Sequence, residues 1–131
     1  MRKLLFIFFA FLMNAAFAQT QADMNKEAYA AYQVADKELN DVYRKILAAY
    51  KPDTAFIYSL RASQRIWIAF RDAELSMKYP EREAGFYGSI HSLCRANYLA
   101  ELTRERTVTL RKWLQGAEEG DACSGSIKIK S

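Results

Sequence analysis

The sequence has few of the residues from which catalytic and metal sites are built. Its 131 residues include a single histidine, His91, and two cysteines, Cys94 and Cys123. His91 and Cys94 are three positions apart, a spacing that would bring a thiol and a base onto one face of a helix. One histidine cannot supply a ligand set for zinc, and no two carboxylates are placed across a cleft as glycoside hydrolysis requires. We therefore expect no enzyme activity, no metal and no cofactor.

Glycine and proline are also scarce, with five and two residues. Apolar residues recur every three or four positions over long stretches that contain neither, which is typical of amphipathic helices. The pattern predicts three helices, over residues 21–50, 53–78 and 89–115. Pro52 and Pro80 end the first two helices, because proline disfavours the helical conformation of the residue before it. Asp53 is placed to cap the second helix and Gly116 to end the third.

Alternating strand patterns and internal repeats are both absent from the sequence. The fold class predicted is all-α, a small antiparallel three-helix bundle in up-down-up order. The connection at residues 51–52 is so short that the first two helices should be neighbours. The buried stripe of the second helix is expected to hold Phe56, Leu60, Ser63, Trp67 and Phe70. Residues 116–131, rich in glycine and serine, are expected to form an irregular tail.

A long hydrophobic run occurs only at the beginning of the chain. Arg2 and Lys3 precede an apolar run over residues 4–13, and small residues lead to Ala16-Phe17-Ala18. This order is typical of a cleavable signal peptide, and the run is too short for a membrane span. We expect a signal peptide over residues 1–18, a helical domain over 19–115 and the tail. The mature chain would be periplasmic or secreted, and without a cysteine at the cut it would have no stable membrane anchor.

Neither sign of charge dominates the sequence. The formal net charge is +4, and removal of Arg2 and Lys3 with the predicted signal peptide leaves 17 basic and 15 acidic residues. Proteins that bind nucleic acids show clustered lysine and arginine, which this chain does not. We expect no nucleic-acid partner.

The two cysteines of an exported protein are expected to form a disulfide, because the compartment is oxidising. Geometry limits a bond between Cys94 and Cys123. An unbroken third helix separates Cys94 from residue 115 by about 32 Å, at a rise of about 1.5 Å per residue. The tail would then have to run straight back along the helix, or the helix would have to end early near Thr107. Pairing between two chains is the other outcome.

Four polar residues lie where the helices are expected to pack. Asp36 and Asn40 share a face of the first helix, and Gln64 and Arg71 share a face of the second. Buried polar groups must find hydrogen-bond partners. We therefore interpret these four residues as a structural polar network between helices.

Residues 80–88 form the only substantial internal loop that the sequence predicts. Loops often carry binding residues. The candidates for contact with a partner, in this loop and at the adjacent helix end, are Glu81, Glu83, Phe86, Tyr87 and His91.

Several segments of this sequence resemble the LprI-like lysozyme-inhibitor domain, which occurs in small exported bacterial proteins. The resemblance covers residues 24–114 and is strongest over 64–74 and 102–107. The residues that carry it are Met24, Asn25, residues 32–40, Tyr43, Leu60, Gln64, Arg65, Trp67, residues 70–74, Gly88, Ser89, Cys94, residues 102–107 and Leu110. It implies an exported helical domain without enzyme activity and, for at least one member, inhibition of lysozyme.

The sequence also departs from that family. Its members often have two cysteines at the positions of Glu27 and Leu75, so we infer that a disulfide common in relatives has been lost here as a pair. An inhibitor of cationic lysozymes would be expected to present an acidic surface. Acidic residues are only locally clustered here, at Glu81 and Glu83 and again within residues 118–121.

These observations favour an exported domain that binds another protein, with a lysozyme-type muramidase as the expected partner. Inhibition would be steric, through the loop at residues 80–91. The alternative is a structural or envelope-stress protein of the periplasm without lysozyme affinity, whose polar residues serve only the fold.

Overall fold

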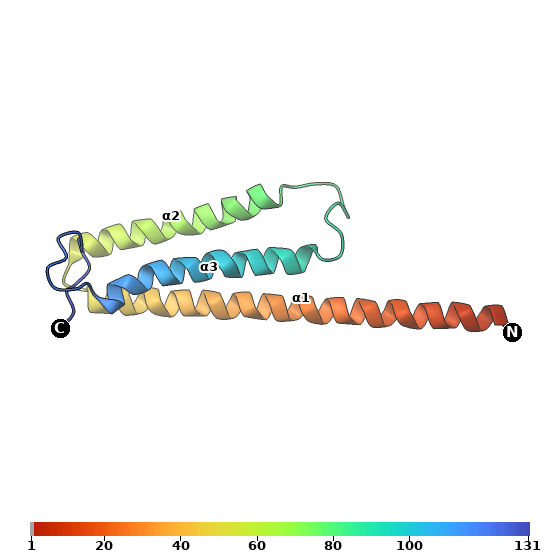
Figure 1. Cartoon of the computed structure of the whole chain (residues 1–131). Helices are drawn as coiled ribbons and strands as arrows, with labels where there is room; N and C mark the ends of the chain where they lie inside the picture. The colour runs from red at the N-terminus through yellow and green to blue at the C-terminus, as the bar shows by residue number, and fades with distance from the viewer. Residues whose placement is uncertain (1) are drawn as a thin grey trace.

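The protein is a bundle of three helices joined by one tight turn and one longer loop. The computed structural model describes residues 2–131, with side chains from Met13 onward. Its helices are α1 (Arg2–Ala49), α2 (Thr54–Lys78) and α3 (His91–Gln115). α1 and α3 run in one direction and α2 in the other (Figure 1). The predicted all-α, up-down-up three-helix bundle is confirmed.

The ends of α2 and α3 lie close to where local sequence signals put them. The side chain of Asp53 accepts a hydrogen bond from the backbone N–H of Phe56 at 3.0 Å, so Asp53 is the N-cap of α2. Gly116 follows α3 with a φ of +78°, and a Cβ at this position would lie 3.0 Å from the carbonyl oxygen of Lys128. A glycine is therefore required where the chain leaves α3.

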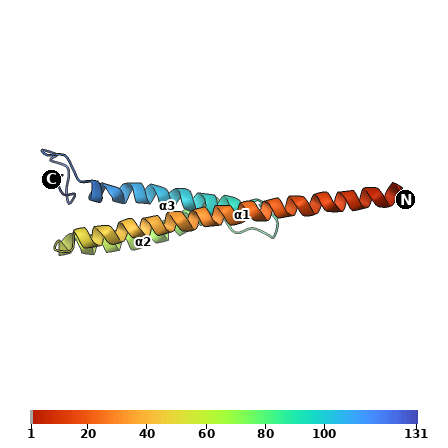
Figure 2. The same ribbon diagram turned by 90° about the horizontal axis from the view of Figure 1, so that it is seen from below.

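α1 is much longer than the sequence pattern predicted. It begins at Arg2 rather than near residue 21, because no glycine or proline interrupts the chain before Ala49. The charged and apolar part of the predicted signal peptide lies outside the residues whose side chains are described, so cleavage after Ala18 stays a prediction. Among the side chains of α1 that the structure describes, from Met13 onward, the first buried one is that of Ala28. Both views show the N-terminal part of α1 extending beyond the other helices (Figures 1 and 2).

In the part of the chain that the structure describes, no helix has both the length and the apolar character needed to cross a bilayer.

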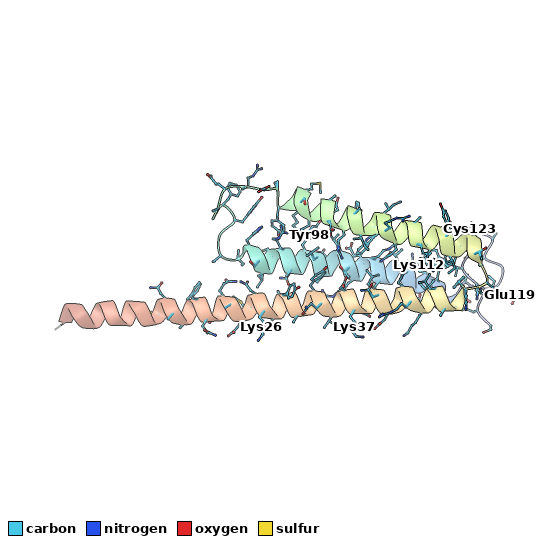
Figure 3. The ribbon with its side chains drawn as sticks, turned by 180° about the vertical axis from the view of Figure 1, so that it is seen from behind. Lys26, Lys37, Tyr98, Lys112, Glu119 and Cys123 are labelled. Atoms are coloured by element: carbon cyan, nitrogen blue, oxygen red, sulfur yellow. The ribbon has the colours of Figure 1, made fainter. Side chains whose placement is uncertain are left out.

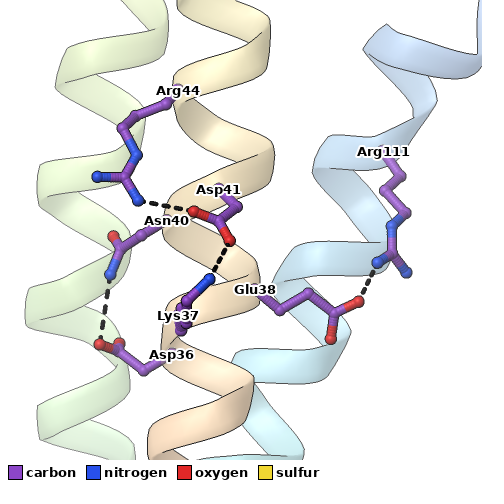
Figure 4. Close-up of polar contacts among 7 residues, drawn as sticks. All are labelled: Asp36, Lys37, Glu38, Asn40, Asp41, Arg44 and Arg111. Carbon is purple, nitrogen blue, oxygen red and sulfur yellow. Dashed lines mark hydrogen bonds and ion pairs between the residues drawn. The ribbon is translucent and has the colours of Figure 1, made fainter.

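α1 packs most closely against α3, although the short turn joins it to α2. Many of the buried residues of these two helices are small, namely Ala28, Ala35, Ala96, Ala100, Thr103 and Thr107, and they lie alongside the larger Leu39, Val42, Ile46 and Leu110. Small side chains let two helix backbones approach each other. The ion pair between Glu38 of α1 and Arg111 of α3 joins the same two helices (Figure 4). α2 lies further out and meets its neighbours through longer side chains.

The core lies toward the end of the bundle where α1 and α2 are connected. Its buried residues are Leu39, Val42, Ile46, Tyr50, Leu60 and Leu110. Phe56 and Trp67 pack against this core as predicted, but Ser63 is exposed and Phe70 is 52% exposed, so the assignment of these two residues to the buried stripe is wrong. The buried positions of α2 are the predicted Leu60 together with Gln64 and Leu75. The polar Gln64 can occupy a buried position because α3 supplies it with a hydrogen-bond donor.

The tail after Gly116 has no helix, and it folds back over the end of the core. An isolated bridge joins Ala117 to Ile129. The hydroxyl of Tyr50 donates to the carbonyl of Trp113 at 2.8 Å and accepts from the N–H of Lys128 at 3.0 Å. One buried tyrosine, directly after the end of α1, therefore holds both the end of α3 and the returning tail.

Candidate functional site

The loop between α2 and α3 folds into a defined shape through a series of short turns. The N–H of Phe86 donates to the carbonyl of Glu83, and the N–H of Gly88 donates to the carbonyl of Gly85. Gly85 and Gly88 have φ values of +81° and +75°, in the region that favours glycine. These two glycines let residues 79–90 double back onto the start of α3.

A stack of aromatic rings holds this loop against the helix ends. The rings of Tyr87 and His91 are parallel within 10°, with centroids 4.5 Å apart. Tyr79 meets both edge-on, at 5.7 Å from Tyr87 and 5.2 Å from His91. The Tyr87 hydroxyl donates to the carbonyl of Pro80 at 2.6 Å. Aromatic pairs of this kind contribute beyond the area they bury, so the loop is organised before any partner arrives.

The loop borders an open pocket of about 540 Å³. The residues that line it are Ser76, Tyr79, Pro80, Glu81, Arg82, Glu83, Ala84, Gly85, Phe86, Tyr87, Gly88, His91 and Arg95. All five residues predicted for a partner-binding loop are therefore brought together. Phe86 is 59% exposed, and the Arg82 guanidinium lies 5.8 Å from its ring centroid. We refer to residues 79–91 as the aromatic loop.

His91 and Cys94 are part of the packing behind the aromatic loop. The Nδ1 atom of His91 is buried without a hydrogen-bond partner. Burial raises the pKa of the Tyr79 hydroxyl, and the adjacent Cys94 thiol adds to this effect. No group of three histidine, cysteine or acidic residues that could hold a metal occurs among the described residues. The arrangement favours ring packing over acid–base chemistry.

The predicted disulfide between Cys94 and Cys123 is not formed, and both cysteines are free. Cys94 lies in the first turn of α3, while Cys123 lies in the tail at the opposite end of the bundle (Figure 3). α3 is unbroken through Thr107, whose hydroxyl donates to the carbonyl of Thr103 at 3.0 Å. The hydroxyl of this β-branched residue is thus satisfied within the helix, and α3 does not end early. The intact helix keeps the two thiols apart.

The four residues predicted as one polar network belong to two separate groups. In the first, the Asn40 side chain donates to Asp36 at 3.3 Å, and Arg71 of α2 lies 3.7 Å from the same carboxylate. Arg71 is 13% exposed and also pairs with Asp72. Asp36 and Asn40 leave α1 on the side facing α2 (Figure 4). This group joins α1 to α2.

Gln64 belongs to the second group, which joins α2 to α3. Its side-chain oxygen accepts from Nε of Arg106 at 3.1 Å, and the same guanidinium donates to the Ser63 hydroxyl at 3.0 Å. Burial lowers the pKa of Arg106. Trp67 connects the two groups, because the guanidinium carbons of Arg71 and Arg106 lie 5.4 and 5.9 Å from the centroid of its ring. Sequence reasoning missed Arg106, although it lies in the 102–107 segment that carries the resemblance.

Comparison with known proteins identifies the family of this chain. The family model described as lysozyme inhibitor LprI matches residues 13–110, which include all of α2 and most of α3. An uncharacterized protein of Rhizobium meliloti (strain 1021) is 35% identical over 115 residues, covering 77% of this chain and 78% of its own length. No solved structure matches. The matched region contains the aromatic loop and both polar groups around Trp67, and the chain belongs to the LprI lysozyme-inhibitor family.

Proposed function

We propose that this protein is exported and inhibits lysozyme-type muramidases by inserting the aromatic loop into the substrate cleft. Family membership supports an inhibitor rather than an enzyme. The observation that carries the proposal is the exposed Phe86 on a loop whose other rings are already stacked. An ordered loop loses little conformational entropy on binding, so more of the contact energy contributes to affinity.

Phe86 has the properties of an anchor residue. Aromatic side chains that enter a partner's pocket contribute a large share of binding energy in many interfaces. The ring of Tyr87 packs edge-on against that of Phe86, with the two centroids 5.0 Å apart. Such a loop can exclude substrate without any chemistry by the inhibitor.

The charge of the aromatic loop also suits a cationic enzyme. Glu81 and Glu83 are exposed beside Phe86, and with Arg82 between them they leave the aromatic loop with an excess of one negative charge. Complementary charge speeds encounter and selects partners. The mixed charge of the rest of the chain does not oppose this, because screening limits charge effects to about 10 Å at ordinary salt concentrations.

The test is inhibition of lysozyme-catalysed clearing of a cell-wall suspension by the purified protein. Phe86→Ala should weaken inhibition about tenfold or more. Phe70→Ala is the matched control, because Phe70 is exposed to a similar extent on α2, away from the loop. The control variant should inhibit as well as the parent.

Absence of inhibition by the parent at a large molar excess over the enzyme would contradict the proposal and favour the structural or envelope-stress alternative. Equal loss of inhibition in both variants would reject the aromatic loop as the inhibitory element. Export is tested separately, by the intact mass of protein from a periplasmic extract. That mass should correspond to a chain that starts at Gln19.

A further inference from the structure

A second candidate site lies on α1, on the face that borders α2. It is a shallow trough of about 740 Å³. Its lining residues are Tyr29, Tyr32, Gln33, Asp36, Lys37, Asn40, Tyr43 and Arg44. Residues 29–44 cover about 22 Å of helix at about 1.5 Å per residue. The trough is thus long enough for an extended ligand, and it does not include the aromatic loop.

Three tyrosines provide the apolar surfaces of this trough. Tyr29 is 55% exposed, and its ring lies 6.2 Å from that of Tyr32 at an angle of 56°. Tyr32 and Tyr43 are half-buried. Burial raises the pKa of Tyr32, so its hydroxyl stays neutral and can both donate and accept hydrogen bonds. The rings therefore combine flat apolar faces with polar edges.

Ion pairs balance the charged side chains in and around the trough. Lys37 and Arg44 both contact Asp41, at 2.8 and 2.7 Å. Asp36 accepts from Asn40 and lies 3.7 Å from Arg71, which also contacts Asp72, so the cations Lys37, Arg44 and Arg71 are balanced by Asp36, Asp41 and Asp72. Figure 4 shows the contacts of Asp41 with Lys37 and Arg44, and that of Asn40 with Asp36, along one stretch of α1. The trough is consequently rich in hydrogen-bonding groups but carries no excess of either charge.

This combination suits one class of ligand better than others. A charged polymer would find no net field to attract it. An apolar helix would cover polar groups without satisfying them, which costs free energy. A sugar strand presents flat CH faces for the tyrosine rings and hydroxyl groups for the planar side chains of Gln33 and Asn40. We propose that the α1 trough binds a neutral oligosaccharide.

The experiment uses the purified full chain and calorimetric titration with three neutral hexasaccharides, namely chitohexaose, cellohexaose and maltohexaose. At least one should bind saturably, with an affinity that hardly changes between low and high salt. Tyr29→Ala should weaken that binding about tenfold. Tyr58→Ala is the control, because Tyr58 is 79% exposed on α2, outside the trough. The affinity of the Tyr58→Ala variant for the sugar should equal that of the parent.

Failure of all three sugars to bind would overturn the proposal, as would binding that Tyr29→Ala and Tyr58→Ala weaken equally. Strongly salt-dependent binding would overturn it in favour of an ionic contact. The proposal is independent of lysozyme inhibition. Phe86→Ala should leave sugar binding unchanged, and Tyr29→Ala should leave lysozyme inhibition unchanged, so the failure of one proposal is distinguishable from the failure of the other.

Discussion

Arg106 of α3 donates its Nε proton to the side-chain oxygen of Gln64 of α2 at 3.1 Å, and Gln64 is only 7% exposed. Arg106→Leu would leave a buried amide without this donor. The expected cost is about 1 to 3 kcal/mol in the free energy of unfolding, measured by urea denaturation. Arg104→Leu changes an exposed arginine two positions away and should cost much less. If both variants have the same urea midpoint of unfolding as the parent, the contact between Arg106 and Gln64 contributes nothing to stability.

Tyr50 supports the tail through its hydroxyl, which lies between Trp113 and Lys128. Tyr50→Phe keeps the ring and its packing against Phe56, at 4.7 Å between centroids, but removes both hydrogen bonds. We expect a loss of about 1 to 2 kcal/mol and faster hydrogen exchange at the amide of Lys128. Exchange at Lys128 as slow as in the parent would show that the tail is held by other contacts.

Asp41 makes the stability of the folded protein depend on pH in the acid range. Hydrogen bonds from Lys37 and Arg44 lower its pKa below the ordinary value of 3.8. A lowered pKa in the folded state stabilises the protein above the unfolded-state pKa, and this stabilisation is lost as the pH falls through the folded-state pKa. Asp41→Asn should therefore melt below the parent at neutral pH, and the difference should vanish well below pH 3.8. Asp23→Asn, at an exposed position in α1, serves as the control. A difference that persists unchanged into acid would contradict this assignment.

The two thiols should be countable and should differ in reactivity. Cys123 is exposed and Cys94 is half-buried. A thiol reagent should modify Cys123 first in the folded protein and should find two thiols per chain after denaturation without reductant. Cys123→Ser should leave the melting temperature unchanged, since no bond is lost. A monomer without free thiols would mean that α3 breaks to let the cysteines meet.

Apart from the start of α1, the helix ends could be predicted from the sequence because their causes are local. The Asp53 cap, the proline after Lys51 and the glycine after α3 each act within a few residues. The choice of packing partner could not be predicted in this way. The short turn predicted that α1 and α2 would be neighbours, whereas α1 packs far more closely against α3, and many of the buried residues of these two helices are small.

The candidate site shows the same division. The five residues predicted to contact a partner are close in sequence, so a single loop prediction placed them together, as the structure also does. The partner of Gln64 is 42 residues away on α3, and no local pattern distinguishes Arg106 from the exposed Arg104. The prediction that Phe70 is buried failed for a related reason. The periodicity of a sequence identifies the apolar face of a helix. It does not give the rotation of that helix about its own axis relative to two neighbouring helices.

The packing of α1 on α3 also sets the order in which the chain can fold. The two helices that approach most closely are separated in sequence by the whole of α2 and the aromatic loop. Contacts between distant segments require a large loop to close before they stabilise anything, which slows folding relative to that of a simple helical hairpin. Until α3 is in place, the buried face of α1 lacks its close-packed partner. The protein therefore gains its core late, when nearly the whole chain is present.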